Sequence, residues 1–292
     1  MLNIERVLGQ DRLVRAMTGL NRKAFEDLLP SFAVEYERVN STLTKPRQRA
    51  RGGGAKAKLE NAQEKLFYIL FYFKCYPTFD LAGVIFDLDR SQTHRWMHRL
   101  QPILQETLGK EMVLPVRKLR SIEEFIAYFP EVKEVIIDGT ERPIQRPSNL
   151  DKQKQNYSGK KRRHTRKHLA GVCPNKQVLV LTHSREGKLH DQRFHDEEDI
   201  IGGIPDEIMV LLDSGFQGVQ KDYDNLKLPH KKPRGGKLTD EQKQENRLLS
   251  SRRVICEKAF SGVKRYNAVA QVYRNRLSNF DDSLMLTACG LW

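Results

Sequence analysis

The 292-residue sequence lacks the features of three common classes of protein. No CxxC motif or Cys/His spacing typical of zinc ligands occurs, because the four cysteines lie far apart, at Cys75, Cys173, Cys256 and Cys289. A chain this long can bury a substantial core without disulfides, so we expect these cysteines to be reduced. The longest apolar run, Leu66 to Phe73, is too short to span a bilayer, which takes ~20 residues. The N-terminus has no cationic stretch followed by an apolar core, so we expect neither a signal peptide nor a membrane segment.

Acidic residues are scarce relative to basic ones. The chain has 51 Lys and Arg against 37 Asp and Glu, a net charge of +14 and a pI of about 9.6. This balance favours a polyanionic partner, because each phosphate that Lys or Arg neutralises releases a counterion. A merely soluble basic protein is the alternative, but the charge is clustered. Residues 43–58 contain six basic residues, no acid and three consecutive glycines, which indicates a flexible basic loop or a solvated linker.

Residues 1 to about 112 have the spacing of helices. Asn21 can cap a helix that runs to Leu29, where Pro30 interrupts it. A second helix is predicted from about Leu59 to Lys74, with its apolar residues on one stripe. This part of the chain is therefore expected to form an all-α domain.

The segment Thr78–Leu100 fits a helix-turn-helix pattern. Gly83 stands where the two helices would cross closely, Asp87 takes a turn position that often needs a positive φ, and Ser91 can cap the second helix. That helix would present side chains suited to base edges and phosphates: Gln92, His94, Arg95, His98 and Arg99. Three-helix packing without nucleic-acid contact would give the same apolar pattern and stays open as an alternative.

From Glu131 onward the pattern changes to short strands, after Pro102 and Pro115 bracket the entry into a second domain. Strands are predicted at Glu134–Asp138, Leu169–Cys173, Val178–His183 and Ile208–Asp213, of which the middle two form a hairpin. Helices are predicted at residues 195–201 and from Leu238 to about Tyr266, and the second of these starts with capping-box spacing at Thr239.

Two of these strands end in an aspartate. Asp138 closes the apolar run 135–137 and Asp213 closes the run 208–212, as expected for strands buried on both faces. If the strands are parallel neighbours, their ends lie ~4.8 Å apart, and two carboxylates that close repel unless a cation lies between them. Either aspartate could instead be a helix cap or a turn residue. Other acids compete for the role: Glu141, Asp191, Asp196, Glu197, Glu198 and Asp199.

A third candidate acid, Glu257, lies within the last predicted helix. Arg253, Glu257 and Lys264 form a stripe rotated by ~100° from an apolar stripe of the same helix. Glu257 would therefore lie at the border of the buried face. Two carboxylates at strand ends and one on a helix can hold two divalent cations against a phosphodiester. A surface ladder of salt bridges is the alternative interpretation of this stripe.

The densest positive charge lies between the two aspartates. Residues 142–168 contain one acid, Asp151, and ten basic residues, with Tyr157 as a ring on which a base could stack. The ten are Arg142, Arg146, Lys152, Lys154, Lys160, Lys161, Arg162, Arg163, Arg166 and Lys167. A second basic run follows Asp213, at residues 227–237. Basic segments beside an acidic site suit a nuclease, and we expect Lys160, Lys161, Arg162 and Arg163 to contact the nucleic-acid backbone.

The chain resembles the DDE transposases of bacterial insertion sequences in the IS-five/Harbinger superfamily. The resemblance is carried by the helix-turn-helix at Thr78–Leu100 and by four strings in the family's order: DGTERPIQRP, YSGKKRRHTRKH, LLDSGFQG and RVICEKAFSGVKR. The ending FDDSLMLTACGLW is also similar, so the resemblance covers most of the chain. It implies an α/β RNase H-like catalytic domain, with a mixed sheet flanked by helices, over residues 116–292. An all-α helix-turn-helix domain over residues 1–115 would precede it.

The resemblance also implies which residues form the site. Asp138, Asp213 and Glu257 would be the catalytic and metal-binding triad. The cofactor would be Mg2+, as two ions for which Mn2+ can substitute. Related transposases carry Tyr, Arg, Glu and Lys at set spacings on the last helix. Arg253, Glu257 and Lys264 match that spacing, and the resemblance assigns DNA ends to Arg253 and Lys264. Ser250 stands where the Tyr would be, so that role has no counterpart here.

The implied activity is that of a transposase, which cleaves DNA at transposon ends with metal ions and transfers the freed 3′-hydroxyl strand into target DNA. The partners would be double-stranded DNA, with terminal inverted repeats bound by the N-terminal domain, and further copies in a homodimer or larger assembly. We expect a cytoplasmic, nucleoid-associated bacterial protein with no membrane contact. Two alternatives stay open: a DNA-binding regulator derived from a transposase, with an inactive or domesticated nuclease domain, and an RNase H-type hydrolase that acts on RNA.

Overall fold

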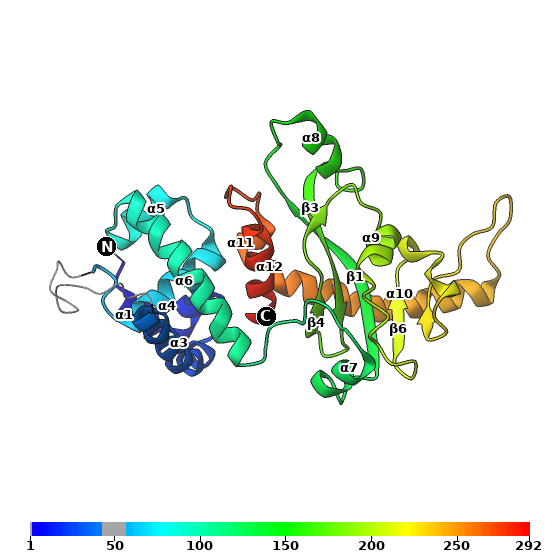
Figure 1. Ribbon diagram of the computed structural model, residues 1–292, viewed down its shortest axis with the longest axis horizontal. Helices are drawn as coiled ribbons and strands as arrows, with labels where there is room; N and C mark the ends of the chain where they lie inside the picture. The colour runs from blue at the N-terminus through cyan, green and yellow to red at the C-terminus, as the bar shows by residue number, and fades with distance from the viewer. Residues whose placement is uncertain (1, 43–56) are drawn as a thin grey trace. The chain divides into compact units, whose positions relative to one another are not determined.

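The structure is a computed structural model that describes residues 2–42 and 57–292 (Figure 1). One compact unit consists of Met1–Leu114, Arg265–Gln271 and Leu291, and the other of Pro115–Lys264, Val272–Gly290 and Trp292. The basic run expected at residues 43–58 lies outside the described residues, apart from its last two positions. The domain limits expected from the sequence, 1–115 and 116–292, stay a prediction.

All regular secondary structure among the described residues of the first unit is helical. Its helices are α1 (Ile4–Leu8), α2 (Asp11–Thr18), α3 (Arg22–Thr42), α4 (Ala62–Cys75), α5 (Phe79–Phe86), α6 (Arg90–Lys110) and α11 (Asn267–Ala270). Every residue of α4 from Leu66 to Phe73 is buried. The longest apolar run of the chain is therefore a core helix, and the other helices of this unit pack around it.

Two prolines lie inside helices, where the sequence prediction was wrong. Asn21 does cap α3, since its side-chain oxygen accepts a hydrogen bond from the Ala24 N–H at 2.7 Å. The helix nevertheless continues past Pro30, with Phe25 and Phe32 buried on either side of it. A proline removes one backbone donor, and we attribute the continuation to the apolar burial on both sides, which outweighs that loss. Pro102 likewise lies inside α6 rather than at a domain boundary.

A buried carboxylate ties α3 to α6. Glu35 accepts hydrogen bonds from Nε of Arg38 at 2.8 and 2.9 Å and forms an ion pair with Lys110. The side chain of Glu35 is 1% exposed, whereas its two partners are half exposed. The hydrogen bond from Arg38 lowers the pKa of Glu35 to about 2, and Lys110 adds to this effect.

Helices α5 and α6 form the predicted helix-turn-helix. Asp87 ends α5 with φ 54° and ψ 50°, the left-handed conformation that the turn needs. A Cβ on Gly83 would lie 2.5 Å from the carbonyl oxygen of Leu88, so glycine is required where the turn packs against α5. The predicted cap was wrong. Asp89 caps α6 in a capping box with Gln92, because the turn is short enough for the helix to begin at residue 90 and Ser91 falls in its first turn.

The second unit is built on one mixed sheet (Figure 1). Its strands are β1 (Glu134–Pro143), β2 (Tyr157–Ser158), β3 (Arg163–Val172), β4 (Val178–Leu181), β5 (Arg185–Glu186), β6 (Met209–Leu212) and β7 (Leu226–Lys227). The order is β2-β3-β1-β6-β7, and β4 and β5 also pair with β3. Strand β1 is central, because it pairs antiparallel with β3 and parallel with β6. Its position explains why the apolar run 135–137 is buried on both faces.

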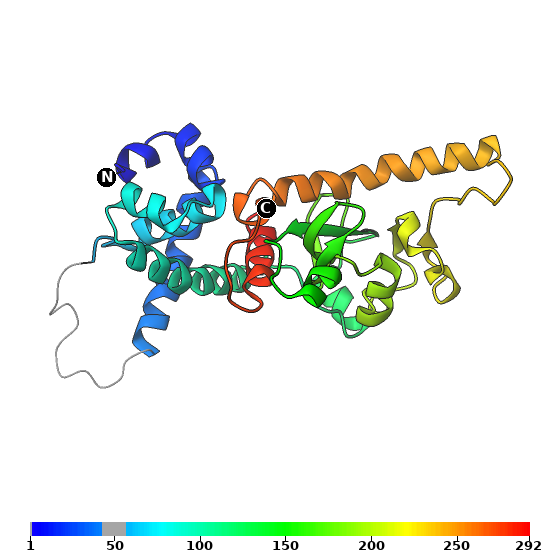
Figure 2. The ribbon, with the colours of Figure 1, turned by 90° about the horizontal axis from the view of Figure 1, so that it is seen from above.

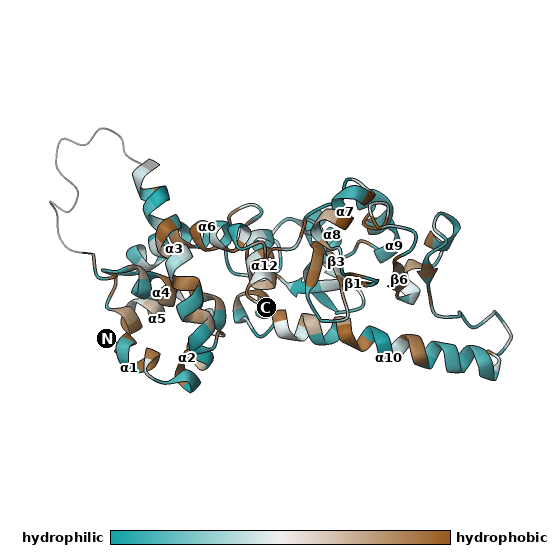
Figure 3. Cartoon of the chain, turned by 90° about the horizontal axis from the view of Figure 1, so that it is seen from below, coloured by the Kyte–Doolittle hydropathy of each residue, from teal (hydrophilic) through white to brown (hydrophobic). Residues whose placement is uncertain are grey.

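Helices flank this sheet. They are α7 (Ile122–Tyr128), α8 (Leu150–Asn156), α9 (Asp191–Glu198), α10 (Asp240–Val263) and α12 (Phe280–Gly290), with the 3-10 turns η1 (Ser214–Phe216) and η2 (Val219–Lys221). Helix α10 runs along one face of the sheet and continues past its edge (Figure 2), where its outer part is mostly hydrophilic (Figure 3). The start of α10 confirms the capping box predicted at Thr239.

The two faces of β1 meet different helices. Val135 and Ile137 belong to a core that also contains Phe194 of α9 and Phe216 of η1. Because side chains alternate along a strand, Ile136 and Asp138 face the other side, toward α10. The side chain of Asp138 thus faces α10, whereas the backbone of Gly139, which carries no side chain, faces α9.

Helix α9 begins and ends earlier than the predicted helix at residues 195–201. Asp199, with φ 48°, stops it after Glu198, and Ile200 and Ile201 then enter the core as loop residues. The polar start at Asp191 carries no apolar spacing, so periodicity alone missed the first turn.

In the described part of the chain, no helix has the length and apolar character needed to cross a membrane. All four cysteines are free thiols, as expected.

Candidate active site

The strand register brings Asp138 and Asp213 together. The parallel pairing of β1 with β6 matches Ile137 with Leu212, and Asp138 and Asp213 are the next residues along the chain. The neighbouring parallel strands assumed from the sequence are therefore confirmed. The predicted strand end at Asp138 was wrong, because β1 continues to Pro143 through its pairing with β3, whereas β6 does end directly before Asp213. Both carboxylates are about three-quarters or more buried, at 18% and 25% side-chain exposure. Each accepts a hydrogen bond of 2.7 Å at Oδ1 from the backbone N–H of the residue that follows it.

A guanidinium lies against both carboxylates. Nη1 of Arg253 is 2.9 Å from Oδ1 of Asp213, and Nη2 is 3.6 Å from Oδ2 of Asp138. Arg253 comes from α10, and its side chain is 17% exposed. The guanidinium therefore supplies the positive charge that two adjacent carboxylates need to offset their repulsion.

Burial dominates the electrostatics of Asp138. It raises the pKa of this carboxyl above its ordinary value, and the neighbouring Asp213 raises it further. Arg253, the Gly139 N–H and Lys160 act in the opposite direction. A buried carboxyl whose ionisation depends on nearby cations suits a metal ligand, since a divalent cation would favour the charged form.

Glu257 is placed differently from the two aspartates. It is exposed on α10, one turn after Arg253. Burial raises the pKa of the Cys256 thiol, and both Asp138 and Glu257 contribute to the same shift, so both carboxylates act on that thiol. Among residues 2–42 and 57–292, no three acids, histidines or cysteines converge closely enough to hold a metal ion. The structure therefore brings together two members of the expected triad, Asp138 and Asp213, with Arg253 against both, and the role of Glu257 stays a prediction.

The donor set of Asp138 and Asp213 fits a hard divalent cation. Mg2+ and Mn2+ prefer carboxylate oxygens, and two converging carboxylates need positive charge for mutual stability. Arg253 supplies that charge in this structure and stands in for a cation.

Four exposed basic residues follow β2. Lys160, Lys161, Arg162 and Arg163 are all exposed, around the turn from β2 to β3. Lys160 acts electrostatically on Asp138. Lys264 is partly buried, and burial together with Lys161 lowers the pKa of its ammonium. These positions are compatible with backbone contacts to DNA, which stay a prediction.

Three of the ten basic residues between the aspartates are buried or partly buried, whereas the other seven are exposed. Arg142 is 1% exposed and stacks on the ring of Tyr273 at 4.5 Å. Arg166 donates a 2.7 Å hydrogen bond to the carbonyl oxygen of Ser184. Lys167 is held inside the unit by acids and a carbonyl group. Sequence reasoning missed this because the residues that enclose these three side chains, Tyr273, Ser184 and Asp191, belong to other segments of the chain.

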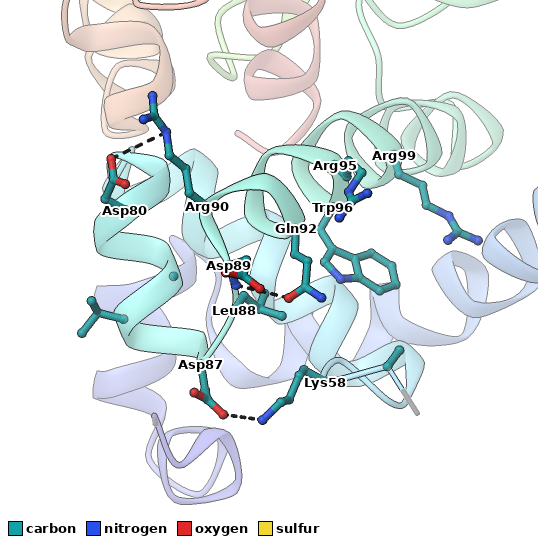
Figure 4. A pocket seen from close by; sticks show the side chains of 13 residues that line it. Lys58, Asp80, Asp87, Leu88, Asp89, Arg90, Gln92, Arg95, Trp96 and Arg99 are labelled. Atoms are coloured by element: carbon teal, nitrogen blue, oxygen red, sulfur yellow. Dashed lines mark hydrogen bonds and ion pairs between the residues drawn. The ribbon is translucent and has the colours of Figure 1, made fainter. Parts of the chain in front are cut away.

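A second candidate surface lies on the helix-turn-helix. A depression of about 990 Å³ lies over the turn and the first three turns of α6 (Figure 4). The residues predicted to contact DNA that line it are Gln92, Arg95 and Arg99. Arg95 is exposed, but Gln92 accepts the capping hydrogen bond from the Asp89 N–H at 3.2 Å. Arg99 stacks over Trp96, with 5.3 Å from its guanidinium carbon to the ring centre, and donates a hydrogen bond to Asn40.

The two histidines of α6 lie along another side of the helix. The rings of His94 and His98 are 4.4 Å apart, and His94 also contacts Phe79 at 5.1 Å. Burial lowers the pKa of His98 to about 4, and His94 adds to this shift. His98 is therefore neutral near pH 7 and suits packing better than phosphate contact, whereas His94 and Arg95 are exposed at the start of the helix.

Comparison with known protein families shows which family the chain belongs to. Residues 137–292 match the family described as DDE superfamily endonuclease. The chain belongs to the DDE superfamily of endonucleases. Its residues 57–110 match the helix-turn-helix of DDE superfamily endonuclease. The mixed sheet with flanking helices is accordingly an RNase H-like endonuclease domain, and the helix-turn-helix domain precedes it, as the resemblance implied.

One relative of this endonuclease covers nearly the whole chain. A protein of Microchaete diplosiphon, described as a probable transposase for insertion sequence element IS702, is 28% identical over 270 residues. The similarity covers 92% of this chain and 89% of the relative. No solved structure matches the endonuclease.

Proposed function

We propose that this DDE endonuclease is the transposase of an insertion sequence. It would cleave DNA at the transposon ends and transfer the resulting 3′-hydroxyl strand into target DNA. The observation that carries the proposal is the register of β1 and β6, which brings Asp138 and Asp213 to adjacent positions with a cation against both. The IS702 relative and the helix-turn-helix support the same function.

Asp138 and Asp213 would hold Mg2+, or Mn2+ in its place, with Glu257 completing the set from α10. Bound divalent cations supply Lewis acidity, which activates water and stabilises charge on the oxygen that leaves the scissile phosphate. Two cations would match this reaction, because an attacking and a leaving oxygen both need stabilisation. Arg253 of α10 and Lys264, the C-cap of the same helix, would contact the DNA end. Lys160, Lys161, Arg162 and Arg163 would hold its backbone beside the carboxylates.

The helix-turn-helix domain would bind the terminal inverted repeats. Arg95 has the exposure and the donors for a bidentate contact with a guanine edge, and His94 lies next to it. A homodimer or larger assembly would hold the two ends of the element together.

A strand-cleavage assay on DNA carrying the element's ends, with Mg2+ or Mn2+, tests the catalytic assignment. Asp138→Asn, Asp213→Asn and Glu257→Gln keep the shape of each side chain and remove its charge, so each should lower cleavage at least about a hundredfold. Glu241→Gln, in the exposed first turn of α10, is the matched control and should cut like wild type. Wild-type cutting by Asp138→Asn or Asp213→Asn would overturn the proposal. Wild-type cutting by Glu257→Gln alone would remove only this residue from the set.

A DNA-binding regulator with an inactive nuclease domain is the second candidate that the sequence left open, and the comparisons do not favour it. Specific binding that survives chelation, with no cutting under either metal, would revive it. A preference for RNA–DNA hybrids over DNA duplexes would instead favour the RNA hydrolase.

A further inference from the structure

Asp191, the first residue of α9, touches the backbone beside both proposed metal ligands. A Cβ built on Gly139 would lie 3.1 Å from its Oδ1, and a Cβ built on Gly215 would lie 3.0 Å from its Oδ2. Gly139 directly follows Asp138, and Gly215 comes two residues after Asp213. One carboxylate group is therefore packed against β1 directly after Asp138 and against the turn after Asp213, and a methyl group added at either glycine would make an unusually tight contact with it.

Lys167 of β3 holds Asp191 in this position. Its Nζ donates hydrogen bonds to Oδ1 of Asp191 at 2.9 Å and to the carbonyl oxygen of Leu189 at 2.7 Å, and it lies 3.9 Å from Oε1 of Glu141. The side chains of Lys167 and Asp191 are only 9% and 16% exposed. An ion pair this enclosed gains little stability for the fold relative to apolar packing, so its presence at this junction calls for another reason.

The neighbouring residue of α9 packs on the same loop. A Cβ on Gly218 would lie 2.6 Å from Nε2 of Gln192, so the first turn of α9 contacts two glycines of the segment after β6. This contact comes from the face of the sheet opposite α10, since Gly139 and Asp138 alternate along β1. The segments that carry Asp138 and Asp213 are therefore contacted by α9 on one face of the sheet and by α10 on the other.

We propose that Asp191, fixed by Lys167, is a positioning residue that sets the separation of Asp138 and Asp213 for metal binding. The inference rests on the proposed function of the two aspartates. Asp191 acts through the backbone rather than as a ligand, because its two carboxylate oxygens lie against Gly139 and Gly215 and one of them is paired with Lys167. A metal site must be held to within about 0.5 Å, and a carboxylate packed against both ligand-bearing segments controls the distance between them directly.

The test is Mn2+ binding to the full-length protein without DNA, with the half-saturating Mn2+ concentration measured by isothermal titration calorimetry and the rise in melting temperature with Mn2+ as a second readout. The variants are Asp191→Ala, Gly215→Ala and the double variant. Asp191→Asn keeps the shape of the side chain in case Asp191→Ala does not fold. Asp196→Ala removes an acid of the same helix that is 59% exposed, and serves as the control. A merely structural residue would change the melting temperature without changing the half-saturating Mn2+ concentration.

We expect Asp191→Ala, Asp191→Asn and Gly215→Ala each to raise the half-saturating Mn2+ concentration by roughly tenfold, the lower range for residues that orient metal ligands. The double variant should resemble Asp191→Ala alone, because the added methyl enters the space that the carboxylate leaves. The Asp196→Ala control should bind Mn2+ like wild type. Unchanged Mn2+ binding in Asp191→Asn, or effects in the double variant that simply multiply, would overturn the inference.

Asp138→Asn separates this inference from the proposed function. If it abolishes Mn2+ stabilisation while Asp191→Asn leaves it intact, only the positioning role fails. If Mn2+ stabilises Asp138→Asn as it does wild type, the metal assignment itself fails, and the role of Asp191 fails with it.

Discussion

Replacing Arg253 by Gln should lower the free energy of unfolding of the metal-free protein and raise its affinity for divalent cations. At an effective dielectric constant of ~20, charges 2.9 and 3.6 Å apart attract by ~6 and ~5 kcal/mol before desolvation is counted. Desolvation cancels much of this attraction, and breaking a largely buried charge pair typically costs about 3 kcal/mol. The variant leaves two neighbouring carboxylates without that cation, so its free energy of unfolding in chelator should fall by about 3 kcal/mol.

Mn2+ should reverse this loss. In wild type the cation competes with the guanidinium for the same oxygens, whereas in Arg253→Gln it meets no competitor. If about 1.4 kcal/mol of the lost pairing is recovered, Mn2+ binds the variant about tenfold more tightly. Urea unfolding with and without Mn2+ measures both effects, and isothermal calorimetry gives the affinity directly.

Lys258→Gln is the matched control, because it removes a positive charge from an exposed position of the same helix. It should change neither the stability nor the Mn2+ affinity by more than about 0.5 kcal/mol. The reasoning is refuted if Arg253→Gln unfolds like wild type in chelator, or if Mn2+ stabilises the two proteins equally.

Three further results are expected. The folded-state pKa of Glu35, about 2, lies below its ordinary value of 4.5, so its ion pairs stabilise the fold above pH 4.5 and lose this effect as the pH falls toward 2. Because its partners are half exposed, the loss should be about 1–2 kcal/mol, and Glu35→Gln should abolish this part of the pH dependence in urea unfolding. Gly83→Ala should lower the free energy of unfolding by about 2 kcal/mol, since its methyl meets a backbone carbonyl, whereas Gly9→Ala, with a 3.5 Å nearest contact, should change it little in a thermal melt. In DNA titrations, Arg95→Ala should reduce sequence preference, and a His98→Gln variant should keep the wild-type salt dependence because His98 is neutral at pH 7.

The sequence predicted the parts of the fold that periodicity and strong local signals specify. The apolar runs before Asp138 and Asp213 indicated two doubly buried strands, and the structure pairs them in parallel. The turn at Asp87 was predicted because few residue types adopt a positive φ. The proline inside α3 was not, since local propensity argues for a break and only tertiary burial overrides it.

The site was harder to predict, because distances between elements are not written in local patterns. The spacing of Arg253 indicated that it shares a stripe of its helix with Glu257, but not that it contacts both aspartates. Asp191 was one of several competing acids with nothing to single it out. A usable signal was present in the glycines at 139 and 215, one and two residues after the aspartates, since a glycine within or beside a strand is typical of a close approach by another chain segment.

Adjacent arginines attach α10 to β1 at two separate points. Arg252 forms an ion pair with Glu134 at the start of the strand, while Arg253 reaches Asp138 four residues further along. An inserted residue rotates everything beyond it by ~100° about the helix axis. Length changes in the hydrophilic outer part of α10, ahead of these anchors, would leave the helix–strand alignment intact, whereas a single insertion between Arg253 and Glu257 would rotate Glu257 relative to the anchored arginines. Tolerance to insertions along this one helix should therefore change abruptly within a turn.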